Sequence, residues 1–275
     1  MRARWLVVVS AVLLASCGAA PYHSTQGARI VRFTLRSGLM QRSLHEVLVV
    51  PAGPSAGRPL LVLLHGRSSG ADQFLGNPMF TELRRLGRNA PVILIPSGGD
   101  HSYWHDRADG PWGSYVVREA IPAALARTGA DGKSIAIGGA SMGGFGALDL
   151  ARLHPGRFCA VGAHSAAIWP TAGQTASGAF DGPADFARHD VMGAASRGNP
   201  YGRTPILVDV GRDDGFRFAD EQLARDLRAH GARVTFRLEP GGHSGWRDRM
   251  AQYLRFYTSA LESCRTSEGG SQTSR

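Results

Sequence analysis

The chain has 275 residues, of which 43% are hydrophobic and 19% charged, a composition typical of a folded globular protein. Its length is enough for one large domain with a substantial core, and three cysteines are too few for a disulfide scaffold. The formal net charge is +9, and of the 31 basic residues only Lys133 is lysine. Because the arginines are spread along the whole chain rather than gathered in one stripe, we exclude nucleic acid as a partner.

The N-terminus has the organisation of an export signal. Two arginines precede an apolar run over residues 5–15, which is shorter than the 18 or so residues that span a membrane, and small residues follow it. Residues 14–17, Leu-Ala-Ser-Cys, resemble the lipobox of bacterial lipoproteins. We therefore predict a signal peptide over residues 1–16 and a lipid on Cys17 that anchors the protein to the outer face of the cell membrane; ordinary cleavage and secretion is the alternative.

The remainder of the chain is predicted to form one domain. Residues 17–27 are small and polar and are interpreted as the lipidated cysteine with a tether, and residues 265–275 as a disordered tail. The α/β domain then spans residues 28–264. An oxidising compartment would permit a bridge between Cys159 and Cys264, but the apolar neighbours of Cys159 favour a buried thiol.

Apolar runs alternate with longer amphipathic stretches between these ends. Eight runs are predicted as strands, at residues 30–35, 46–50, 60–64, 91–95, 134–138, 158–163, 206–210 and 234–238. Five stretches are predicted as helices, at residues 73–86, 112–127, 143–153, 216–230 and 246–261. This alternation indicates an α/β fold with a mostly parallel central sheet covered on both faces. The first two strands are expected to form an antiparallel hairpin, and residues 166–203 a lid-like insertion with a short helix near residues 183–188.

The strongest chemical signal is a serine on a strand-to-helix turn. Gly139-Ala-Ser141-Met-Gly143 fits the pattern G-x-S-x-G, with an apolar strand before it and a helix after it. Glycines suit the strained turn that exposes a nucleophilic serine in this setting. We predict that Ser141 is the nucleophile and that the N–H groups of Met142 and of Arg67, in the loop after an early strand, stabilise the oxyanion.

A serine nucleophile needs a base and an orienting acid. Where the serine lies on a strand-to-helix turn of an α/β sheet of this kind, the acid and then the histidine follow it in the chain. His243 lies in a glycine-rich loop between the last strand and the last helix and is predicted to be the base. The acid should follow the penultimate strand, where Asp213 and Asp214 are adjacent and the residue pattern does not choose between them. His164, which follows a strand beside Ser165, is interpreted as structural.

Four blocks together resemble the esterase D-like, or putative esterase, family of the α/β-hydrolase fold, whose members include S-formylglutathione hydrolases, feruloyl and acetyl-xylan esterases and mycolyltransferases. The blocks cover residues 63–66, 102–106, 139–144 and 241–246, with an acidic loop at residues 211–214. The resemblance implies that Asp214 rather than Asp213 is the triad acid. Within these blocks we expect substrate contacts from the side chains or backbone of His65, Gly66, Tyr103, Trp104 and Trp246.

His101, His105 and Asp106 could suggest a metal site, but the flanking glycines and proline indicate a loop, on which histidines four residues apart do not share a face. We therefore predict neither a metal nor an organic cofactor. The expected function is an exported serine hydrolase acting on a small-molecule or cell-envelope ester. The alternatives are an acyltransferase or depolymerase acting on envelope or polysaccharide esters, an amidase, and a surface-binding lipoprotein without activity.

Overall fold

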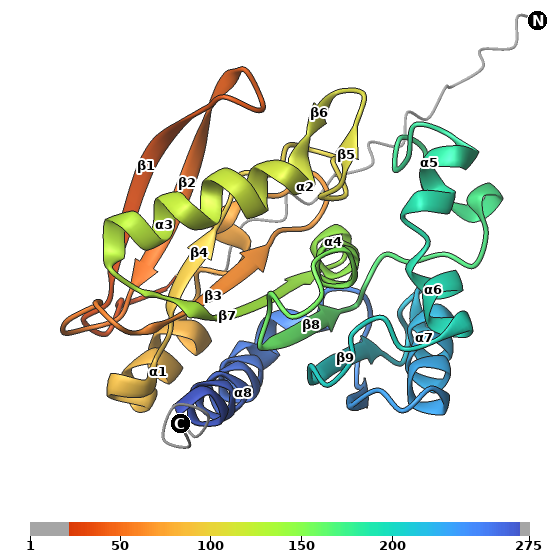
Figure 1. Cartoon of the computed structure of the whole chain (residues 1–275). Helices are drawn as coiled ribbons and strands as arrows, with labels where there is room; N and C mark the ends of the chain where they lie inside the picture. Colours follow the sequence, from red (N-terminus) through yellow and green to blue (C-terminus); the bar gives the residue numbers. More distant parts are fainter. Residues whose placement is uncertain (1–21, 270–275) are drawn as a thin grey trace, which may run out of the picture.

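Eight strands form one central sheet in the computed structural model, which describes residues 22–269 (Figure 1). The strand order is β1-β2-β4-β3-β7-β8-β9-β10. The strands are β1 (Arg29–Ser37), β2 (Arg42–Val50), β3 (Pro59–Leu64), β4 (Val92–Ile95), β7 (Asp131–Ala140), β8 (Ala160–His164), β9 (Ile206–Gly211) and β10 (Val234–Glu239). β2 is antiparallel to both β1 and β4, and all other neighbours are parallel. The predicted mostly parallel sheet and its edge hairpin are therefore confirmed.

Helices cover both faces of the sheet because its inner strands are apolar on both sides. All six residues of β3 are buried, and alternate side chains enter two separate cores. One core contains side chains of α1 (Asn77–Leu86) and α8 (Met250–Gly269), and these two helices pack together below the sheet in Figure 1. The opposite core contains side chains of α2 (Trp112–Tyr115), α3 (Ile121–Thr128), α4 (Met142–Leu153), α6 (Val191–Arg197) and α7 (Arg217–Ala229).

Short elements complete the chain and differ in places from the sequence prediction. The predicted helix over residues 112–127 is one continuous helical stretch in which α2 and α3 are joined by the π-helical η3 (Val116–Ala120). The lid-like insertion holds the predicted helix, α5 (Pro183–Arg188), together with α6, which was not predicted. The remaining short elements are η1 (Ala71–Gln73), η2 (Gly87–Asn89), β5 (Asp106–Arg107), β6 (Gly110–Pro111), η4 (Ala172–Gln174) and η5 (Gly245–Arg249).

The two ends of the domain are more ordered than the sequence suggested. The signal peptide and Cys17 lie outside the described residues, but the described part of the tether packs on α1: the ring centroid of Tyr22 lies 4.8 Å from that of Phe80, and the His23 N–H donates to Asn77. At the other end, α8 continues to Gly269, into the segment predicted as a tail. Helix propagation past residue 264 is inexpensive once the preceding turns are fixed by packing.

A disulfide bridge joins Cys159, next to β8, to Cys264 on α8, with the two Cα atoms 5.8 Å apart. The bridge links residues 105 positions apart and secures the last turns of α8 to the sheet. Among residues 22–269, no helix is both long enough and apolar enough to cross a bilayer.

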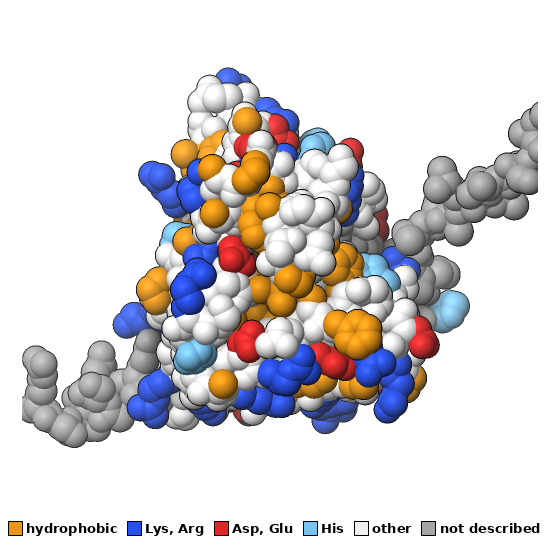
Figure 2. Space-filling model, turned by 90° about the vertical axis from the view of Figure 1, so that its right-hand side faces the viewer, with side chains coloured by type: hydrophobic (Ala, Val, Ile, Leu, Met, Phe, Trp, Pro, Cys, Tyr) orange, Lys and Arg blue, Asp and Glu red, His pale blue; other side chains and the backbone are white. Residues whose placement is uncertain are grey.

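Charged side chains of both signs are mixed on the face that carries α5, α6 and α7 (Figure 2). Hydrophobic side chains lie between them in the middle of this face, and no continuous basic stripe crosses it. On this side of the molecule the surface therefore has the mixed charge pattern expected from the scattered arginines.

Candidate active site

Ser141 occupies a strained turn between β7 and α4, with φ 57° and ψ −117°. Left-handed backbone is costly for a residue with a side chain and persists only where the surroundings enforce it. Two flanking glycines make the turn possible. A Cβ at Gly139 would lie 2.4 Å from the backbone of Gly143, and one at Gly143 would lie 1.8 Å from the carbonyl oxygen of Leu64 on β3. The turn therefore packs against the neighbouring strand so closely that only glycine fits.

The structure brings the three predicted triad residues together in one chain of hydrogen bonds. Nε2 of His243 lies 2.9 Å from Oγ of Ser141, and Nδ1 of the same ring lies 3.0 Å from Oδ2 of Asp214. The three residues follow β7, β9 and β10, whose carboxyl ends meet at one edge of the parallel sheet. With Nδ1 donating to the carboxylate, Nε2 is free to accept the proton of the serine hydroxyl.

The loop after β9 separates the two candidate acids. Asp213 is exposed and its backbone N–H donates to the carbonyl of Gly241, whereas the side chain of Asp214 is fully buried. Burial alone would raise the pKa of Asp214, but hydrogen bonds from His243 and from the N–H of Phe216 lower it below its ordinary value. The carboxylate that contacts the imidazole therefore remains ionised at neutral pH.

The loop that carries Arg67 passes beside the serine. A Cβ on Gly66 would lie 3.6 Å from the Cβ of Ser141 and 3.5 Å from the carbonyl oxygen of Ala140, which are ordinary contact distances and place Gly66 directly beside the turn. The N–H of Gly66 donates to Oε1 of Gln73, which fixes the loop from the far side. Met142 is the first residue of α4, where backbone N–H groups have no partner within the helix. Arg67 directly follows Gly66 and Met142 directly follows Ser141, so both predicted oxyanion residues adjoin the two residues that meet here.

Three side chains that we expected to contact substrate are instead part of the supporting structure. Both ring nitrogens of buried His65 are occupied, by the carbonyl of Gly66 and the N–H of Gly98. Trp104 has no exposed surface, and its indole N–H donates to the carbonyl of His65. Trp246 is buried in the core beneath the sheet, 5.4 Å from the ring of Phe74. Proximity in sequence to the catalytic loops did not reveal which way these rings face.

Tyr103 belongs to a group of aromatic rings next to the triad, most of which the sequence did not identify. Its ring lies 5.8 Å from Phe145, 5.6 Å from Trp169 and 6.2 Å from Phe180. The group reaches the base, since Trp169 contacts Phe216 at 5.6 Å and Phe216 contacts His243 at 5.4 Å. We call these five residues, Tyr103, Phe145, Trp169, Phe180 and Phe216, the aromatic wall. The only sequence signal was that two of these rings, Trp169 and Phe180, lie in an insertion that is rich in Gly, Ala and Pro and holds four large aromatics.

His164 and Asp209 form a separate buried network behind the nucleophile. Nδ1 of His164 lies 2.5 Å from Oδ1 of Asp209, and Nε2 lies 2.9 Å from the hydroxyl of Tyr257. The other carboxylate oxygen of Asp209 accepts a hydrogen bond from Tyr253. The carbonyl of His164 in turn accepts the N–H of Ser141. The network therefore ties β8, β9 and α8 to the turn, and its side chains are turned away from the reacting groups.

The residues considered for a metal in the sequence do not come together as a set. His101 is exposed, and the exposed Asp106 accepts hydrogen bonds from the backbone and hydroxyl of Ser114. His105 alone is buried, and its ring contacts Asp185 in the insertion.

Comparison with known proteins agrees with this architecture. A family model described as "Putative esterase" matches residues 37–252. Esterase MT1326 of Mycobacterium tuberculosis is 34% identical over 115 residues, which are 39% of this chain and 25% of that protein, so the match spans about a quarter of that relative. A ferulic acid esterase structure aligns with a TM-score of 0.73 at 21% identity, covering 85% of this chain and 98% of that one. An S-formylglutathione hydrolase structure from Agrobacterium tumefaciens aligns with a TM-score of 0.74 at 20% identity. The alignment covers 89% of this chain and 99% of that one.

The two structural alignments show a shared α/β-hydrolase fold, and the family model extends over most of the sequence. The chain therefore belongs to the Putative esterase family.

Proposed function

We propose that the protein is a serine esterase that cleaves carboxylic esters through an acyl-enzyme. Oγ of Ser141 attacks the ester carbonyl while His243 accepts its proton, and the N–H groups of Arg67 and Met142 bind the oxyanion of the tetrahedral intermediate. His243 then protonates the leaving alcohol as the C–O bond breaks. A water molecule, deprotonated by the same histidine, attacks the acyl-serine and releases the acid. Asp214 holds the imidazole in the required tautomer and stabilises the imidazolium.

The observation that carries this proposal is the hydrogen-bonded chain from Asp214 through His243 to Ser141 on a strained turn. His243 is 43% exposed and Ser141 is partly exposed, so a substrate can reach both. The family and the printed names of its relatives, a ferulic acid esterase and an S-formylglutathione hydrolase, favour ester or thioester chemistry over amide cleavage.

Hydrolysis and acyl transfer share the acyl-Ser141 intermediate and differ only in whether water or an alcohol attacks it. Turnover of p-nitrophenyl acetate and octanoate, with and without added alcohols, separates them. We expect p-nitrophenol and free acid to form in equal amounts. Ester products that replace the acid when alcohols are present would support a transferase instead. Failure to turn over any ester, with parallel cleavage of an anilide, would reassign the site to amide chemistry.

Export and lipid attachment are part of the same proposal. The signal pattern in residues 1–16 and Cys17 supports them, and the Cys159–Cys264 disulfide is of the kind that persists outside the reducing cytosol. Labelled palmitate fed to a bacterial host that expresses the full chain should be incorporated, and Cys17→Ser should abolish the labelling. Labelling that survives Cys17→Ser, or none in the parent, would refute attachment at this residue.

A further inference from the structure

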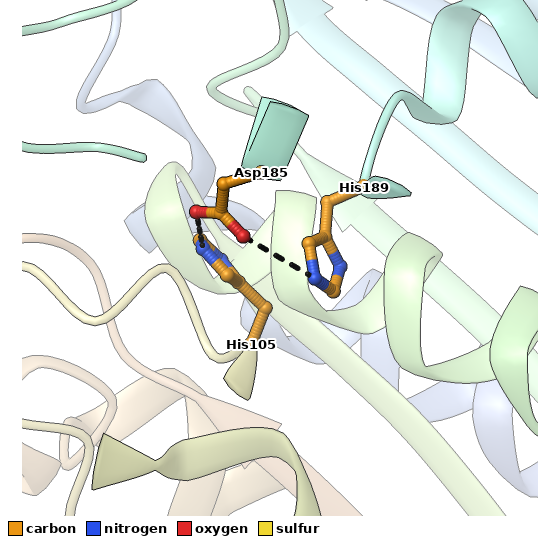
Figure 3. A group of neighbouring side chains, drawn as sticks. All are labelled: His105, Asp185 and His189. Carbon is orange, nitrogen blue, oxygen red and sulfur yellow. Dashed lines mark hydrogen bonds and ion pairs between the residues drawn. The ribbon is translucent and has the colours of Figure 1, made fainter. Parts of the chain in front are cut away.

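Two histidines and an aspartate meet in a buried cluster where the insertion contacts the body of the domain (Figure 3). His105 precedes β5, Asp185 lies in α5, and His189 follows the last residue of α5. Asp185 faces one imidazole ring with each carboxylate oxygen, and the centroids of the two rings lie 4.4 Å apart. Oδ2 is 3.1 Å from Nε2 of His105, and Oδ1 is 3.8 Å from Nε2 of His189.

The surrounding contacts hold these groups in the form that binds a cation. Nδ1 of His189 lies 2.7 Å from Oδ2 of Asp149 and donates to it, so the lone pair of that ring is on Nε2, facing Asp185. A carboxylate behind a histidine is the usual outer contact of a metal-binding imidazole. Asp185 is oriented by the N–H of Asp181 at 2.9 Å and by Arg188 at 2.9 Å, whose own side chain is largely exposed.

Within the part of the chain that the structure describes, the ring of His105 has a hydrogen-bond partner at only one of its two nitrogens. Its residue is 1% exposed, and its Nδ1 is buried without a hydrogen-bond partner among the described residues. Nε2 is the nitrogen that faces Asp185, so an ion held by the three side chains would bind Nε2 and leave the ring proton on Nδ1.

The donor set selects the class of ion. Two imidazole nitrogens and one carboxylate oxygen suit a borderline cation such as Zn²⁺, whereas Ca²⁺ and Mg²⁺ take oxygen ligands almost exclusively. With bonds of about 2.1 Å, two donors on a tetrahedral ion are about 3.4 Å apart. The ligand atoms of His105, Asp185 and His189 all lie within 4.8 Å of one another. Small side-chain movements would therefore close the site around an ion.

We propose that His105, Asp185 and His189 bind one zinc-class divalent ion. Such an ion would join α5 to the loop before β5 at a place that is separate from the triad. It would also support the aromatic wall, because the His105 ring stacks on Phe180 at 5.1 Å and meets Phe145 at 6.1 Å. The inference does not depend on the proposed esterase activity.

The test is direct metal binding by the full chain, prepared without a histidine tag and with Cys17→Ser, so that neither a tag nor a free thiol contributes. After treatment with a chelator and its removal, Zn²⁺ is titrated in competition with a chromophoric chelator. Co²⁺ is added to a second sample, because its visible spectrum reports coordination number and nitrogen ligation. We expect one equivalent of Zn²⁺ to bind saturably, and visible bands typical of a low-coordinate Co²⁺ site to appear.

Three variants locate the ion. Asp149→Asn leaves all three ligands in place but replaces the charged outer contact of His189 by a neutral amide, and should weaken binding by about 10–100-fold. His189→Gln should weaken it at least as much. His230→Gln, at the exposed end of α7, is the matched control and should bind as the parent does.

Far-UV circular dichroism shows which of these proteins are folded. A folded parent that binds no Zn²⁺ overturns the proposal without recourse to any variant, and the cluster is then a hydrogen-bonded anchor for α5. Equal affinity in the parent and in folded Asp149→Asn and His189→Gln would place the ion elsewhere and overturn it as well.

Discussion

Glu46 provides a quantitative test of the buried electrostatics of this fold. It lies on β2 with no exposed surface, accepts a hydrogen bond from the hydroxyl of Tyr115, and accepts another from the N–H of Ser97 at 3.2 Å. Burial raises the pKa of Glu46 to about 7 from an ordinary value of 4.5, and the two hydrogen bonds only partly oppose the shift. Between these two pH values the folded protein therefore holds a proton that the unfolded chain has released.

The sign and size of the effect follow from this difference. Stability falls with rising pH wherever the folded state binds more protons, so the contribution of Glu46 decreases from about pH 4.5 and is lost above about pH 7. At about 1.4 kcal/mol per pKa unit, the loss is roughly 3 kcal/mol. Glu46→Gln keeps the shape of the side chain but cannot ionise. Relative to the parent, it should gain roughly 3 kcal/mol of unfolding free energy between pH 4.5 and pH 8.

The assay is urea unfolding of the parent and Glu46→Gln at pH 4.5 and pH 8, with the disulfide intact. The double difference cancels every other titrating group that the two proteins share. Glu262→Gln, on the exposed side of α8, is the matched control for replacing a surface glutamate by glutamine. A difference between parent and Glu46→Gln that stays constant with pH, or one that favours the parent at pH 8, would refute the reasoning.

Three further substitutions test the site and its support. Asp214→Asn should reduce kcat for ester hydrolysis by up to about 10⁴-fold, because the imidazole loses its required tautomer. Asp213→Asn, at an exposed position, should change kcat only slightly. Equal losses in the two variants would contradict the assignment of the acid. Gly143→Ala places a Cβ 1.8 Å from the carbonyl oxygen of Leu64, which should displace Ser141 and lower turnover by about 100-fold or more. Gly173→Ala, whose Cβ would meet nothing within 4 Å, should leave turnover unchanged. An active Gly143→Ala would show that the turn tolerates a side chain. Cys264→Ser removes a bridge between residues 105 positions apart and should lower the unfolding free energy, measured by chemical denaturation, by about 2–5 kcal/mol. Reduction of the parent should cause the same loss. An unchanged unfolding free energy in Cys264→Ser would show that the bridge does not form.

The parts of the fold that sequence could predict are those governed by local pattern. The all-apolar run of β3 indicates a strand buried on both faces, and the glycine spacing around Ser141 indicates a turn of defined geometry. Both depend on residues a few positions apart. α6 was missed because its short run, Val-Met-Gly-Ala-Ala-Ser-Arg, carries a glycine and little periodicity.

Contacts between distant segments were beyond the reach of such patterns. Trp104 and Trp246 were expected near substrate, but the packing of whole layers decides which face a ring occupies, and both are buried. The residue pattern could not show which of the two acids contacts the histidine. The path of one loop decides this, because it exposes Asp213 and buries Asp214. His105 meets Asp185 across 80 positions, so the cluster they form with His189 has no signature in sequence.

The central claim is that Ser141 is a nucleophile activated by its neighbours. Treating the full chain and Ser141→Ala with a fluorophosphonate, followed by mass spectrometry of the labelled peptide, tests it most directly. We predict one adduct on Ser141 in the parent, none in Ser141→Ala, and loss of p-nitrophenyl acetate hydrolysis in the variant, with melting temperatures that agree closely. A folded parent that remains unlabelled and inactive, or an adduct on another residue with activity retained in Ser141→Ala, would contradict the account.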